Sequence, residues 1–222
     1  MSQIKIHQIY YKNEQKKNLE ASFHPYYNDS NVGKKWFEYG VFKKEFEKRS
    51  IPLNGFIGYM SWKFYTKTDV HGKKFIEFIE KNPGFDVYFI NPFLMESLMF
   101  QSQWENGEFH HRGITEITNN VFKSIGYDSH ILEKPQKSDI QLYSNYWVGN
   151  ESFWLKYMSY TLPVYRYVEN LTDTELLKLI LTNADKKIQA TYIPFIMERL
   201  FTLLLMSDSS IRYMPYRYSN SE

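Results

Sequence analysis

The stretch HGKKFIEFIEKNPGFDVYFINPF, residues 71 to 93, is the clearest guide to the fold class of this chain. Its apolar residues between Phe75 and Ile79 fall on one face of a helix, and Asn82-Pro83-Gly84 is a strong helix stop signal. The apolar run from Val87 to Ile90 follows at once and predicts a short buried strand that ends in a polar Asn and a Pro. A helix, a short turn and an apolar strand in this order indicate an α/β sheet.

Two further stretches predict strands of the same sheet. IKIHQIYY, residues 4 to 11, alternates isoleucines with polar residues. GFIGYMSWKFY, residues 55 to 65, is an apolar run with two glycines that fits a central strand or the turn after one. Helices are predicted in the second half of residues 34 to 50, ending near Ser50, and in GITEITNNVFKSIGYD, residues 113 to 128.

The chain changes character near residue 150, and its last third is predicted to be helical. ESFWLKYMSYTLPVYRYVEN, residues 151 to 170, reads as a helix that is broken or kinked at Pro163. Thr172 and Glu175 have the spacing of a capping box for the next helix.

A last helix is predicted over YIPFIMERLFTLLLMS, residues 192 to 207, with Pro194 in its first turn. The run from Leu200 to Met206 is apolar all round and too short to span a membrane, so we expect a central buried helix. The tail RYMPYRYSNSE, from residue 212, is expected to fray or to pack as an irregular arm.

The length favours one domain over residues 1–222. The change of character near residue 150 divides it into an α/β part (1–150) and a helical part (151–222). The 27 basic and 25 acidic residues form no concentrated basic stretch, so a nucleic-acid partner is not expected. There is no cysteine and no signal-peptide pattern, which predicts a cytoplasmic protein that reaches a membrane only through partners. The 19 Tyr, 17 Phe and 5 Trp suit carbohydrate stacking, a homo-oligomer interface or simply an aromatic-rich core.

Five motifs carry a family resemblance. In chain order they are IHQIYY, GFIGYMSWKF, GFDVYFINPF, NYWVGNESFWLKY and PFIMERLF. On these motifs the chain resembles small glycosyltransferase-like proteins from bacterial capsule and O-antigen loci. The resemblance implies a reduced A-type glycosyltransferase fold, a Rossmann-like sheet that binds a nucleotide sugar at the carboxyl ends of its strands. It also implies a saccharide or lipid-linked acceptor and other capsule biosynthesis proteins as partners.

The resemblance implies donor-binding residues near the first two strands. His7, Tyr10 and Tyr11 lie at or just beyond the first strand, where ligands of open α/β sheets bind. Trp62 can stack on a sugar or base, and the Lys63 ammonium can meet a diphosphate. The alternatives are a strand histidine satisfied by a neighbour, a tryptophan in the core and a solvated lysine.

The strand end after Ile90 departs from the family pattern. A metal-dependent transferase needs carboxylates there to hold Mg²⁺ or Mn²⁺ against the diphosphate. The chain instead has Asn91, which we assign to donor binding, and we assign no residue to a metal. Asp86 stands before the strand, either as a catalytic carboxylate or as a cap of the preceding turn.

The later motifs supply the remaining candidates. Asn145, Tyr146 and Trp147 are predicted to line an acceptor groove, because amides and aromatic rings suit hydroxyl-rich sugars. Glu198 is the main catalytic candidate and Arg199 a donor-binding one; the alternative for both is a buried salt bridge. His110 and His111, near Glu108, are read as exposed loop residues rather than metal ligands.

Two hypotheses therefore stand. The chain is either a glycosyltransferase that uses a nucleotide-sugar donor, or a non-catalytic glycosyltransferase-like subunit that binds or assembles capsule machinery. Asn91 in place of an acidic pair is the feature on which they divide.

Overall fold

The core of the fold is a mixed sheet. A computed structural model describes residues 3–28, 34–49, 54–172, 174–185 and 189–218 of the chain. Within them, six strands form this sheet in the order β2-β1-β3-β5-β4-β8. They are β1 (Gln3–Tyr10), β2 (His24–Tyr27), β3 (Gly55–Ser61), β4 (Val87–Phe89), β5 (Trp147–Asn150) and β8 (Tyr213–Pro215).

Strand direction brings several strand ends to one edge. β2, β1 and β3 are parallel, β5 runs antiparallel to both β3 and β4, and β8 is parallel to β4. β1, β3 and β4 therefore point the same way, and their carboxyl ends share one edge of the sheet. Ligands of open α/β sheets bind at such an edge.

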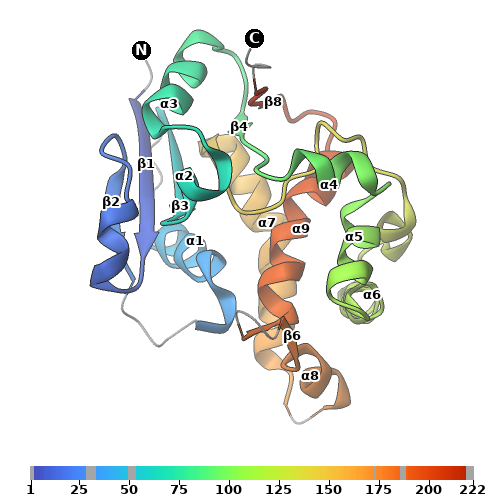
Figure 1. The fold of residues 1–222 in the computed structure, drawn as a ribbon. Coiled ribbons are helices and arrows are strands. Elements are labelled where there is room, and N and C mark those ends of the chain that lie inside the picture. The colour runs from blue at the N-terminus through green and yellow to red at the C-terminus, as the bar shows by residue number, and fades with distance from the viewer. Residues whose placement is uncertain (1–2, 29–33, 50–53, 173, 186–188, 219–222) are drawn as a thin grey trace.

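Helices cover both faces of the sheet (Figure 1). The α-helices are α1 (Glu38–Glu47), α2 (Phe64–Thr68), α3 (Gly72–Lys81), α4 (Leu94–Met99), α5 (Gln103–His110), α6 (Ile114–Ile125), α7 (Glu151–Asn170), α8 (Glu175–Ile180) and α9 (Tyr192–Ser207). Short 3₁₀ helices occupy Asn13–Asn18, Lys34–Trp36 and Ser129–Glu133.

The buried side chains form two hydrophobic clusters, because neighbouring residues of a strand point to opposite faces. In β4, Val87 and Phe89 join a large cluster with α1, α6, α7 and α9. Tyr88, with Ile90 just after the strand, joins a smaller cluster with α2 and α3. The stretch after α3 is thus buried on both sides, as its unbroken apolar run predicts.

The predicted strands and helices up to residue 128 are confirmed, as are the last helix and Pro194 in its first turn. Leu200, Phe201 and Leu203 are fully buried, so α9 is the central helix that was expected. The helix boundary predicted at Ser50 lies outside the described residues.

Two features predicted for the C-terminal helices, a break at Pro163 and a cap at Thr172, are not found. α7 runs unbroken through Pro163, because core side chains such as Tyr157 and Val164 hold the helix on both sides of the proline. The cap of α8 is Thr174 rather than Thr172, since its side chain accepts a hydrogen bond from the amide of Leu177.

The helical third also contains strands that the sequence did not predict. α8 ends at Ile180 and is followed by a small antiparallel pair, β6 (Asn183–Asp185) and β7 (Ala190–Thr191). The tail is not an irregular arm, because β8 adds to the sheet beside β4 and the Tyr216 amide bonds to the Phe89 carbonyl. β8 offers only three residues, too short a run to show a period of two.

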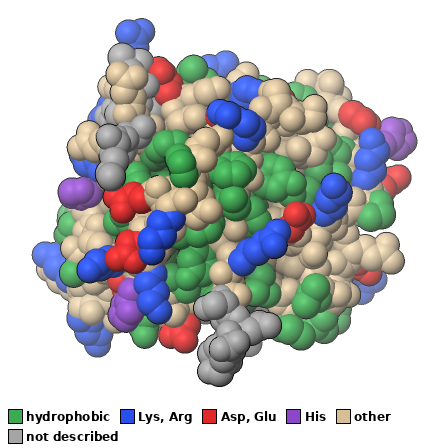
Figure 2. Space-filling view, turned by 90° about the horizontal axis from the view of Figure 1, so that it is seen from above, with side chains coloured by type: hydrophobic (Ala, Val, Ile, Leu, Met, Phe, Trp, Pro, Cys, Tyr) green, Lys and Arg blue, Asp and Glu red, His purple; other side chains and the backbone are tan. Residues whose placement is uncertain are grey.

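No helix in the described part of the chain is long and apolar enough to cross a membrane. On the face seen in Figure 2, basic and acidic side chains are interspersed around an apolar middle.

Candidate functional site

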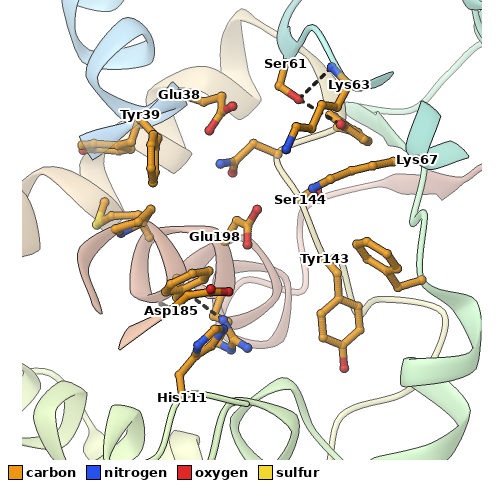
Figure 3. A pocket seen from close by; sticks show the side chains of 18 of the residues that line it. Glu38, Tyr39, Ser61, Lys63, Lys67, His111, Tyr143, Ser144, Asp185 and Glu198 are labelled. Carbon is orange, nitrogen blue, oxygen red and sulfur yellow. Dashed lines mark hydrogen bonds between the residues drawn. The ribbon is translucent and has the colours of Figure 1, made fainter. Parts of the chain in front are cut away.

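A large cleft opens at the edge where β1, β3 and β4 end. Its volume is about 980 Å³, which is ample for a nucleotide sugar. Its lining comes from the residues that follow β1 and β3, the segment before β5, and residues of α1, α2, α5, α9 and β6. Figure 3 shows much of this lining from close by.

Two carboxylates reach into the cleft from different helices. Glu38 is the first residue of α1 and Glu198 lies in the second turn of α9, and both point into the open space in Figure 3. Burial in the cleft raises the pKa of both, and the charge of Glu38 raises that of Glu198 further. Lys67 opposes the shift in both cases. Carboxyl groups with raised pKa in a cleft are typical of acid–base catalysis.

Two ammonium groups face these carboxylates. Lys63 directly precedes α2, and Lys67 lies one turn later, so both side chains leave the same side of the helix. The Lys67 Nζ donates to Ser144 Oγ at 2.8 Å and lies over the rings of Phe93 and Tyr146. The Lys63 Nζ lies over the Trp62 ring and makes no hydrogen bond or ion pair with a described residue.

The cleft contains two backbone conformations that L-residues rarely adopt. Phe37, directly before Glu38, has φ of 47°, and Ser144 has φ of 83°. Such residues persist only where the surrounding structure holds them, and they concentrate at functional sites. Phe37 fixes the entry to α1, and Ser144 turns its hydroxyl to Lys67.

Two polar atoms of the cleft lack a protein partner. The side-chain oxygen of Asn145 is buried and makes no hydrogen bond with any described residue, and the same holds for the hydroxyl of Tyr11. Both residues line the cleft. A buried polar atom without a partner carries a free-energy cost that a bound ligand or water removes.

Arg199 is buried beside Glu198, but its hydrogen bonds go to neutral acceptors. It donates to the carbonyls of Gln103 and Phe195 and to the side-chain oxygen of Asn106. These contacts tie α9 to α5, and the alternative of a buried salt bridge fits the arginine less well than this network.

The structure places other predicted site residues at the cleft. Besides Glu198 and Arg199, its lining includes Tyr11, Trp62, Lys63, Asn145 and Tyr146. The Tyr146 hydroxyl is hydrogen bonded to Ser61 Oγ at 2.9 Å, so it shapes the cleft wall.

Five predicted residues lie outside the cleft lining, and three of them carry rings that pack in or beside the sheet. His7 is stacked on Tyr59 in the sheet, and burial lowers its pKa to about 4. Tyr10 is 7% exposed and packs against Tyr27, and Trp147 is 1% exposed among aromatic core residues.

The residues that flank β4 have structural partners. Asp86 lies at the opposite, amino end of the strand, where it accepts from the backbone of Arg212 and the side chain of Asn150. Asn91 is 5% exposed, donates to Ser97 Oγ and accepts from the amide of Phe93. Asp86 and Asn91 therefore hold the ends of β4, and neither lines the cleft.

The strand ends at this edge do not fit a divalent metal. Tyr11 follows β1, Trp62 and Lys63 follow β3, and no carboxylate stands at any of the three strand ends. No group of three or more His, Asp or Glu side chains in the described ranges could hold a metal ion. The carboxylates of the cleft come from other elements, and the strand ends themselves offer an ammonium group in place of the hard oxygen ligands that a divalent metal needs.

Sequence reasoning missed several residues of the site. Glu38, Lys67 and Ser144 line the cleft, as do His110 and His111, which end α5 rather than lie in a loop. His111 stacks on Phe195 with ring centroids 3.7 Å apart. The spacing of Lys63 and Lys67 was a usable signal, because residues four apart share a helix face.

No protein-family model and no curated protein matches the chain. A solved structure titled as the apo form of the bifunctional glycosyltransferase WbbM is similar in fold, with a TM-score of 0.58 and 12% sequence identity. The match covers 96% of this chain and 44% of that one. At this identity the likeness shows the fold alone, so the chain has a glycosyltransferase-like α/β fold with a helical C-terminal region.

Proposed function

We propose that this chain transfers a glycosyl group from a nucleotide-sugar donor to a saccharide or lipid-linked acceptor in the synthesis of a bacterial capsule or other surface polysaccharide. The fold, the cleft at the carboxyl ends of the strands and the family resemblance of the sequence support it. The observation that carries it is the placement of Glu198 in this cleft, where it faces Glu38 and two lysines and where burial raises its pKa.

In the proposed reaction, Glu198 acts as the general base. It accepts the proton of an acceptor hydroxyl as that oxygen attacks the anomeric carbon of the donor. The bond from this carbon to the phosphate oxygen breaks, and the nucleoside diphosphate leaves with the bonding electrons. A positioned base of this kind contributes about 10² to 10⁴-fold to the rate.

The other cleft residues bind and orient the substrates. Tyr11 and Trp62 offer aromatic faces beside β1 and β3, where the nucleoside would lie. Asn145 presents an unpaired acceptor oxygen that suits a sugar hydroxyl. Glu38 stands opposite as a second acceptor for hydroxyls and tunes the base.

A binding-only subunit is the competing function. The strand end after Ile90 favours it, because Asn91 stands there in place of an acidic pair and its side chain is hydrogen bonded to Ser97 and to the amide of Phe93. Under either function, a cytoplasmic location, assembly with capsule proteins and a homo-oligomer remain predictions from the sequence.

Titration of the purified chain with uridine, cytidine and guanosine diphosphate sugars tests the proposal. We expect a thermal shift with at least one donor and release of its nucleoside diphosphate. Binding without release by any acceptor preparation would favour the binding-only subunit, and no binding, with or without Mn²⁺, would contradict both.

A further inference from the structure

We propose that Lys63 and Lys67 form a diphosphate-binding pair that does the work of a divalent metal, so that donor binding needs no metal ion. This inference rests on the proposed function and names the group that neutralises the donor. The strand ends at the cleft lack the carboxylate ligands that a divalent metal requires.

The two lysines lie at the start of α2, directly after the carboxyl end of β3. β3 is the strand next to the antiparallel β5, and the chain leaves its carboxyl end through Ser61, Trp62 and Lys63 into α2. A diphosphate bound at this edge meets the start of α2. Lys63 and Lys67 project from that segment into the cleft (Figure 3).

The two ammonium groups differ in how they are held. Ser144 holds the Lys67 Nζ at 2.8 Å, and two aromatic rings lie under it, so the charge has a fixed place before any ligand arrives. The Lys63 Nζ has no hydrogen-bond acceptor among the described residues. One fixed and one unpaired ammonium supply two positive charges and several donors to a diphosphate.

The other charged side chains near the two lysines come from different elements of the fold. The third strong cation of the lining, Arg199, is held by three neutral acceptors. The carboxylates of Glu38 and Glu198 come from α1 and α9, across from α2, and lie where the sugar and the acceptor would react. The ammonium groups thus face the two carboxylates across the cleft, and a diphosphate bound beside α2 would have its reacting end toward Glu38 and Glu198.

Calorimetric titration in EDTA tests the pair with defined probes. The probes are UDP, CDP and GDP, each compared with its nucleoside. We expect at least one diphosphate to bind without metal and more tightly than its nucleoside. Lys63→Met and Lys67→Met should each weaken the diphosphate about tenfold or more and leave the nucleoside unchanged, because one charge-assisted contact is lost.

Two controls keep the test specific. Lys67→Arg retains the charge and should stay within about threefold of the wild type, and Lys73→Met removes an exposed lysine of α3 without effect. Thermal unfolding of each variant confirms that it is folded. Met keeps the aliphatic stem, which limits loss of packing.

The outcomes separate this inference from the proposed function. Diphosphate binding only after addition of Mg²⁺ or Mn²⁺, or unchanged binding in both methionine variants, overturns the lysine pair even if the chain transfers sugar. Metal-free binding that depends on both lysines supports the pair even if no transfer is found. No diphosphate binding under any condition overturns both.

Discussion

The Glu38 and Glu198 carboxylates reach one cleft from helices α1 and α9, and the charge of Glu38 raises the pKa of Glu198 beyond the effect of burial. Two acidic groups that share a site rarely ionise independently. If Glu198 is the base of the reaction, Glu38 sets the pH at which it works.

Replacing Glu38 should therefore move the acidic limb of the pH–rate profile. In Glu38→Gln a neutral amide replaces the charge that raises the pKa of Glu198, so the rate should reach half its maximum at lower pH than in the wild type. The measurement is kcat/KM against pH with a saturating acceptor. An unmoved acidic limb would show that Glu38 does not influence the base.

Replacing Glu198 should change stability with pH. Its pKa is raised in the folded state, so above the ordinary value of 4.5 the unfolded chain loses its proton before the folded chain does, and stability falls as pH rises. Glu198→Gln stays neutral, and its stability relative to the wild type should grow from pH 4.5 to neutrality.

Urea unfolding across this pH range measures the effect of Glu198→Gln. The matched control is Glu116→Gln on the exposed side of α6. Its free energy of unfolding should change with pH in the same way as that of the wild type. A Glu198→Gln curve that runs parallel as well would mean that the carboxyl is not desolvated.

Substitutions of Ser144 should distinguish the effect of its backbone conformation on stability from the effect of its hydroxyl. Ser144→Ala and Ser144→Gly both remove the bond to Lys67, but only glycine relieves the left-handed φ of 83°. We expect Ser144→Gly to be about 1 kcal/mol more stable than Ser144→Ala, after allowance for the freedom of glycine when unfolded. Equal stabilities in chemical denaturation would argue against strain at this residue.

His7 should respond to pH as a buried structural residue. Burial lowers its pKa to about 4, so as pH falls from 6.5 toward 4 the unfolded chain binds a proton that the folded chain does not, and stability is lost. His7→Phe keeps a ring against Tyr59 and should lose less stability over that range than the wild type.

The control for His7 is His130→Asn, since the His130 side chain is 83% exposed. NMR titration of the His7 ring offers a direct check. A midpoint near 6.5 would contradict the burial of this side chain.

Local patterns in the sequence were enough to predict the α/β core. The apolar face from Phe75 to Ile79 predicts a helix, the stop signal after it predicts the end of that helix, and the run to Ile90 predicts a strand. Each of these patterns needs only a few consecutive residues. β6 and β8 escaped prediction because each has three residues, and β8 depends on pairing with β4, more than 120 positions away in sequence.

The site was harder to predict than the fold. Residues next to strand ends, such as Tyr11 and Lys63, could be placed by the general rule for open sheets. His7 and Trp147 could not, because alternation along a strand decides which side chains enter the core, and the sequence did not show which face each would take. Glu38 is the first residue of a helix that begins after the left-handed backbone conformation of Phe37. No local sequence motif predicts that conformation.

Donor turnover by wild type and Glu198→Gln, measured as release of free nucleoside diphosphate, tests the central claim most directly. The account predicts that at least one of the uridine, cytidine and guanosine diphosphate sugars is turned over by the wild type. Glu198→Gln should bind that donor within about threefold of the wild type. Its rate of diphosphate release should be lower by a factor of about 100 or more. Equal release by both proteins would contradict the assignment of Glu198 as the base, and so would the absence of any donor that the wild type turns over.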